Sequence, residues 1–311
     1  MTTMLKLTGC WVAVSLSMVI GMALVSALHL HMNAMADPTP PGIKFLAYLL
    51  ACAAMTLACW TLARGLSGAA WLRAAVIASL VFVALGVNNI LDGLIYTHTF
   101  DGAVPANALI TAAAGIMAGL SLGFLFGSRE RSKGLKPMGG MSWVARGLGV
   151  WLAWLVIYLT FGMMVSPFVL RYYTSGIVPG FHIPSFGVII PMQLLRSALF
   201  LAVSLPAVAL WKGSRLGLWV GLGLTHAVSV GWFGLICGTF LPTTMRVGHG
   251  LEITGDSFAY AGLLMLLFRG AGASAAVEQT PIARTQVLQA QRARQRNALQ
   301  SGSSASNRKC Q

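Results

Sequence analysis

The chain has 311 residues, of which 57% are hydrophobic and only 9% are charged. Soluble globular domains carry about 25% charged residues, so this composition excludes them and indicates an integral membrane protein. The formal charge of +14 would suggest nucleic acid in a soluble protein, but here the Lys and Arg residues gather in particular connecting segments, as membrane orientation requires. Nucleic acid is therefore not an expected partner.

Eight apolar segments of membrane-spanning length follow one another along the chain. They cover residues 7–30, 45–66, 74–96, 108–126, 144–172, 188–211, 216–240 and 246–268. Because lipid offers the backbone no hydrogen-bond partners, continuous apolar runs of about 20 residues predict helices and not barrel strands. The predicted fold class is an all-α integral membrane protein with about eight transmembrane helices.

The first apolar segment is followed by Ala34-Met35-Ala36, which resembles a signal-peptidase site. Its apolar run is longer than the 7–15 residues of a signal-peptide core, so we expect an uncleaved first span. With eight spans, Lys and Arg concentrate in the connections after even-numbered spans and in the C-terminal tail, while the other side keeps Lys44, Arg171 and Arg246. The positive-inside rule then predicts that both termini are cytoplasmic. The expected location is the inner membrane of a bacterium, with the lipid bilayer as a partner.

A spaced pattern in the fourth span recurs in the eighth. Ile110-Thr111 and Ala118-Gly119-Leu120 match Ile253-Thr254 and Ala261-Gly262-Leu263 at one constant offset, which Trp11 and Trp154 share. The pattern predicts two parallel four-helix repeats, although low-complexity sequences also produce such matches by chance. The predicted organisation is a first transmembrane half at 1–127, a basic cytoplasmic linker at 128–142, a second half at 143–269 and a basic, largely disordered cytoplasmic tail at 270–311.

Three ionisable residues lie well inside the apolar segments: Asp92, Arg196 and Asp256. A charge at the bilayer centre costs about 2.5–3.5 kcal/mol on insertion scales, so such residues usually face a partner or a wet cavity. A helical rise of about 1.5 Å per residue puts Arg196 and Asp256 at similar depth, which predicts an ion pair between them. That pair would serve either a binding site or only the register of two helices.

Two polar stripes occur at helical spacing, Asn88, Asp92 and Tyr96 in the third span and Glu252, Asp256 and Tyr260 in the eighth. Residues four apart share a helix face, so we predict that both stripes line one cavity toward the extracytoplasmic side. The alternative is that each stripe hydrogen-bonds to neighbouring backbone independently.

His249, Glu252 and Asp256 lie within two turns of one helix and form a candidate metal site. Their nitrogen and oxygen atoms suit zinc or another divalent ion, and His29, His98 or His182 would complete the ligand shell. The signal is weak, because HxxE is common and the stronger HExxH pattern is absent. His226, in the middle of the seventh span, is either a packed interior histidine or an element of a proton relay.

The leading hypothesis is a transporter-like protein with a charged pocket near the extracytoplasmic side for an ion or small solute. Its candidate binding residues are Asn88, Asp92, Arg196, His226, Glu252 and Asp256. The alternatives are a metal-assisted membrane-embedded hydrolase or transferase acting on a lipid-type substrate, and a noncatalytic subunit of a membrane complex. The sequence lacks a phosphate-binding glycine loop, which argues against an ATP-driven pump and leaves secondary transport, a membrane-embedded enzyme and an accessory subunit open. Of these, an enzyme is the less expected. A second copy of the chain is a further expected partner.

Overall fold

A computed structural model describes residues 2–32, 37–97, 102–130, 135, 140–175, 177–178 and 180–269. Eight helical spans, each long and apolar enough to cross a membrane, run through these residues, which contain no β-strand. The predicted all-α class and its eight spans are therefore confirmed. The predicted tail at 270–311 and His98 lie outside the described residues.

Six of the spans are single helices that begin and end within a few residues of the predicted bounds. They are α1 (Thr3–Ala27), α2 (Pro41–Ala63), α5 (Val104–Leu125), α6 (Gly140–Thr174), α7 (Phe186–Leu210) and α10 (Thr243–Arg269). The start of α6 at Gly140 falls inside the predicted 128–142 linker, so the helix begins slightly before its apolar run.

The third and seventh spans are interrupted by π-helical turns, labelled η. The third consists of α3 (Ala70–Val81), η1 (Phe82–Val87), α4 (Asn88–Asp92) and η2 (Gly93–Thr97), and the seventh of α8 (Arg215–Ala227), η3 (Val228–Trp232) and α9 (Phe233–Cys237). η1 and η3 pack against each other. A Cβ atom on Gly231 would lie 2.2 Å from Cδ1 of Ile253, so a larger residue here would displace the Ile253 side chain of α10. Turns of this kind often mark functional positions in helices.

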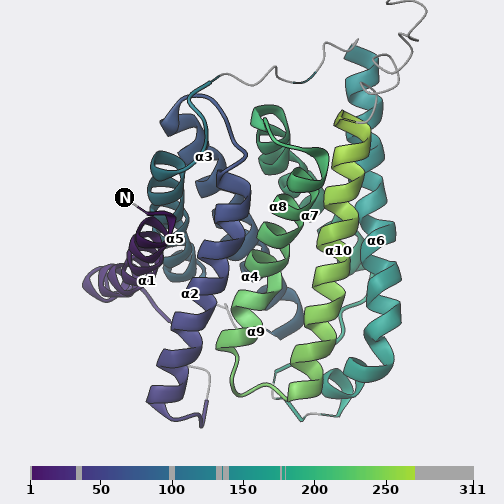
Figure 1. Cartoon of the computed structure of the whole chain (residues 1–311). Helices are drawn as coiled ribbons and strands as arrows, with labels where there is room; N and C mark the ends of the chain where they lie inside the picture. Colours follow the sequence, from purple (N-terminus) through teal and green to yellow (C-terminus); the bar gives the residue numbers. More distant parts are fainter. Residues whose placement is uncertain are drawn as a thin grey trace, which may run out of the picture. The chain divides into compact units, whose positions relative to one another are not determined.

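Helix packing follows the same scheme in the first four spans and in the last four. In the first set α5 packs on α3 and α1, and α1 packs on α2; in the second, α10 packs on α8 and α6, and α6 packs on α7. The two sets meet through α2 with α8 and through α3 with α7, which are again equivalent pairs. α1 and α5 lie on one side of the bundle and α6 and α10 on the other (Figure 1). This is the packing expected of two parallel repeats, and the duplication itself stays a prediction.

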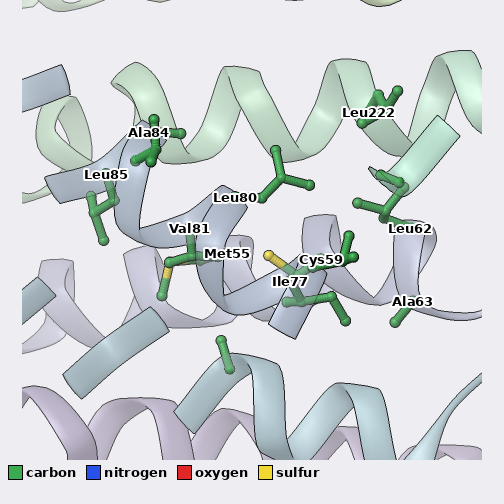
Figure 2. Packing of buried hydrophobic residues seen from close by; sticks show 14 of the residues in the cluster. Met55, Cys59, Leu62, Ala63, Ile77, Leu80, Val81, Ala84, Leu85 and Leu222 are labelled. Atoms are coloured by element: carbon green, nitrogen blue, oxygen red, sulfur yellow. The ribbon is translucent and has the colours of Figure 1, made fainter. Parts of the chain in front are cut away.

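The centre of the bundle is an apolar core built where α2, α3 and α8 meet. Met55, Cys59 and Leu62 of α2 interleave with Ile77, Leu80 and Val81 of α3, and Leu222 of α8 lies beside them (Figure 2). Each of these side chains is fully buried. The core therefore lies between the two sets of spans and joins them into one compact unit that ends at Arg269.

Close packing of α3 on α5 depends on small residues of α5. A Cβ atom on Gly119 would lie 2.4 Å from the carbonyl oxygen of Ala74, and one on Gly123 would lie 2.6 Å from Cα of Ala74. The GxxxG spacing thus lets two backbones touch, as in other membrane helix pairs.

Gly119→Val should destabilise the protein, because the added methyl groups must force α3 and α5 apart. Overpacking of this kind costs about 1–3 kcal/mol. The measurement is the temperature at which detergent-purified protein loses its monodisperse elution peak. Gly9→Val is the matched control, because a Cβ atom on Gly9 meets nothing within 4 Å. Equal thermal stability of the two variants would show that this contact does not stabilise the bundle.

Candidate functional site

A cavity of about 590 Å³ lies at one end of the bundle. Its walls come from η2, the second half of α6, the start of α7, η3 with α9, and the start of α10. This is the end that carries the connections after odd-numbered spans. The volume falls within the range of about 300–1,000 Å³ that small-molecule sites occupy.

Asp92 and Arg196 form an ion pair on the wall of this cavity. Nη2 of Arg196 donates a hydrogen bond to Oδ1 of Asp92. Asn88, directly behind, donates from Nδ2 to Oδ2 of Asp92 over 3.3 Å. The Arg196 side chain is 5% exposed and that of Asp92 is 36% exposed, so the carboxylate is the partner that faces the cavity.

The predicted pair between Arg196 and Asp256 is wrong, because Arg196 binds Asp92 instead. Counting residues estimates the depth of Arg196, but depth does not tell which side of a helix faces which neighbour. α7 packs against α3 and η1 of the third span, and this contact turns Arg196 toward Asp92. The prediction was wrong because residue counting does not give the direction in which the Arg196 side chain points around the helix axis.

Asp256 is the least satisfied acid of the cavity. It is 4% exposed, and its Oδ1 atom has no hydrogen-bond partner. Glu252 lies one turn earlier on α10 and is 8% exposed. Asp256 interacts electrostatically with both Glu252 and Arg196. A buried carboxylate without a direct partner is costly, which is typical of a residue that awaits a ligand.

Aromatic side chains and a short polar chain form part of the cavity wall. The hydroxyl of Tyr173 lies 3.0 Å from Nε2 of His249, and Nδ1 of His249 lies 2.8 Å from Oε2 of Glu252. The Tyr173 ring meets the rings of Tyr96 and Phe181 edge to face. Phe181 belongs to the connection after α6, so this segment contributes to the cavity wall in addition to joining two helices.

The structure tests how well a metal fits His249, Glu252 and Asp256. Both ring nitrogens of His249 already have partners, Tyr173 and Glu252. Among the described residues, no group of three His, Cys, Asp or Glu side chains converges as metal ligands. The three predicted ligands therefore do not form a metal-binding set in this conformation, and zinc binding stays a prediction that metal analysis of the purified protein would test.

The six predicted binding residues occupy three levels. Asp92, Arg196, Glu252 and Asp256 line the cavity, and Asn88 is buried behind Asp92. His226 lies deeper, where its Nε2 atom is 2.9 Å from Oγ of Ser204 and its ring packs against Phe200 and Tyr260. Both polar stripes thus reach one cavity, although Tyr260 lies beneath its floor in the aromatic packing around Trp154.

Part of the cavity wall was missed at the sequence level. Trp154 and Tyr158 of α6 line it, and Tyr158 shares a hydrogen bond of 2.7 Å with the hydroxyl of Tyr96. Gln193, one turn before Arg196, accepts a hydrogen bond of 3.1 Å from the Trp154 indole. The spacing of Trp154 and Tyr158 at four residues, and of Gln193 and Arg196 at three, was the signal available in the sequence.

Comparison of the chain with protein-family models, curated proteins and solved structures found no match. Any functional assignment must therefore come from the cavity and its residues.

Proposed function

We propose that this polytopic membrane protein is a transporter that takes an ion or small solute into the cavity and passes it across the bilayer. The observation that carries the proposal is the set of four charged side chains, Asp92, Arg196, Glu252 and Asp256, around one cavity inside a bundle of apolar helices. Charges in such surroundings usually mark substrate or ion pathways. The distribution of Lys and Arg supports an extracytoplasmic cavity and cytoplasmic termini in a bacterial inner membrane.

A polar column leads inward from the cavity and supports passage over simple binding. It consists of Asp256, Tyr260, His226 and Ser204. Tyr260 follows Asp256 by one turn of α10, its ring centroid is 5.7 Å from that of His226, and His226 contacts Ser204. Nδ1 of His226 and the hydroxyl of Tyr260 are buried with no hydrogen-bond partner. Buried polar groups need such partners, which a passing solute or proton-carrying water would supply.

Two of the three π-helical turns among the described residues, η1 and η3, supply a structural basis for movement. η1 and η3 contact each other, and Val230 and Gly231 of η3 also line the cavity. A π turn breaks the regular hydrogen-bond ladder of a helix and is a common place for it to bend. Bending of the third and seventh spans at this contact would close the cavity on one side and open it on the other, as alternating access requires.

The test of transport uses the full chain in two steps. Purified protein is first screened for thermal stabilisation by a panel of amines, carboxylates, sugars and inorganic cations, and each stabilising solute is then tested for flux into proteoliposomes. We expect flux above that of empty liposomes and its loss in Glu252→Gln. Absence of flux for every stabilising solute would contradict transport. If the protein is instead a noncatalytic subunit, Glu252→Gln should change the assembly of a membrane complex, and no solute flux should be detected for any variant.

His226→Leu should separate binding from passage. Leucine keeps the site apolar and packed, so solute binding in the cavity is expected to stay within about twofold of wild type. Flux should fall by at least tenfold, equivalent to about 1.4 kcal/mol, because the polar column is broken. The control is Leu57→Ala on α2, a side chain that is exposed on the outside of the bundle. Unchanged flux in His226→Leu would exclude the polar column as the route.

A further inference from the structure

We propose that the cavity selects amphipathic organic cations, a substrate class that rests on the transport function proposed above. Charge balance is the first reason. Among the described lining residues, Asp92, Glu252 and Asp256 supply three carboxylates, while Arg196 supplies the single Lys or Arg charge. The Asp92–Arg196 pair neutralises itself, which leaves two acids on α10. His249 contacts Glu252 and, when protonated, offsets one of them. The described lining therefore holds more acidic than basic side chains, which favours a cation over an anion.

Aromatic rings surround the same space. Trp154, Tyr158 and Tyr173 of α6, Tyr96 of η2 and Phe181 all line the cavity. The faces of such rings carry a negative electrostatic potential and attract organic ammonium groups, most strongly where water is excluded. Carboxylates and aromatic rings together are the combination that recognises alkylated or protonated amines.

The carboxyl groups of the cavity lie next to its aromatic rings. A Cβ atom on Gly162 would lie 3.3 Å from Oε1 of Glu252, so this carboxylate faces α6 at Gly162. Tyr158 lies one turn earlier on α6, about 6 Å along the helix. One organic cation can therefore contact the Glu252 carboxylate and the Tyr158 ring together.

The rest of the lining favours an organic cation over an inorganic one. Most of the other lining residues are apolar, among them Leu159, Met163, Val169, Ile189 and Met245. A small hydrated ion requires oxygen ligands that converge on one point, whereas the described carboxylates are distributed along the wall and do not form a three-ligand group. Apolar walls with a few fixed polar groups suit an organic molecule that carries its own hydrophobic surface.

The test measures binding of tetraphenylphosphonium to the purified full chain by titration calorimetry. Tetraphenylborate, an anion of nearly the same shape, is the matched ligand control. We expect stoichiometric binding of the cation, no binding of the anion, and no displacement by an equal concentration of magnesium or potassium chloride. Glu252→Gln and Asp256→Asn should each weaken cation binding about tenfold. Both replacements keep the shape of the side chain, and the elution profile of each variant verifies that it is folded.

Tyr158 supplies a second, independent pair of variants. Tyr158→Phe keeps the ring and should bind tetraphenylphosphonium within about twofold of wild type, whereas Tyr158→Leu removes the ring and should bind roughly two- to thirtyfold more weakly. Equal affinity of these two variants would overturn the aromatic contribution.

Binding of the anion as tight as that of the cation, or unchanged affinity in both carboxylate variants, would overturn the organic-cation assignment. Such a result leaves the transport proposal separately testable. Flux of a neutral or anionic solute that Glu252→Gln abolishes would uphold transport while excluding organic cations. Binding of tetraphenylphosphonium without flux of any cation would instead uphold the ligand class and contradict transport.

Discussion

Asp92→Leu should strongly reduce the amount of folded protein. Arg196 is 5% exposed, and its Nη2 atom donates to Asp92. Removing the carboxylate leaves the guanidinium buried without its counter-charge, and breaking a buried pair in this way costs about 3–5 kcal/mol. The measurement is the yield and melting temperature of detergent-purified protein. A loss below about 1 kcal/mol would show that Arg196 finds other partners and that the pair does not hold the third and sixth spans together.

The double variant Asp92→Leu with Arg196→Leu separates structure from function. Replacing both charges with apolar side chains is often neutral or stabilising, so the double variant should recover most of the lost stability. We expect it to remain inactive in flux and to bind cation differently from wild type, because a cavity wall has lost both charges. Recovery of flux together with stability would show that the pair is purely structural.

Asp256→Asn should have the opposite profile, with stability retained and transport lost. Oδ1 of Asp256 has no hydrogen-bond partner in the protein, so neutralising the side chain breaks no bond that the fold requires. The melting temperature should stay at or above that of wild type. Apparent affinity for the transported solute should fall about tenfold, since a hydrogen bond to a charged group contributes about 1.5 kcal/mol or more.

The contrast between these two acids is informative because they lie in the same cavity. When a residue is retained for binding, replacing it is expected to keep or raise stability while function is lost. If Asp256→Asn lowered the melting temperature as much as Asp92→Leu and left flux per folded molecule unchanged, Asp256 would be a structural residue.

The sequence predicted what depends on local properties. Hydropathy runs located all eight spans, and helical spacing placed Asp92 and Tyr96 on one stripe and Glu252 and Asp256 on another, each of which lines the cavity. The π-helical turns were not predicted, because apolar residues continue through η1 and η3 and hydropathy does not distinguish a π turn from an α-helix. Tyr158 was missed as well, since an aromatic residue in an apolar span looks the same whether it faces lipid or a cavity.

Composition and periodicity by themselves therefore determined the membrane class and the number of spans, because these follow from the apolar length of a segment and the rise of a helix. The tertiary structure alone decided the partners: Asp92 for Arg196, Ser204 for His226, and the aromatic wall beside Glu252. The physical reason is that helix packing sets the rotation of each helix about its own axis. That rotation decides which of several polar side chains at one depth come into contact.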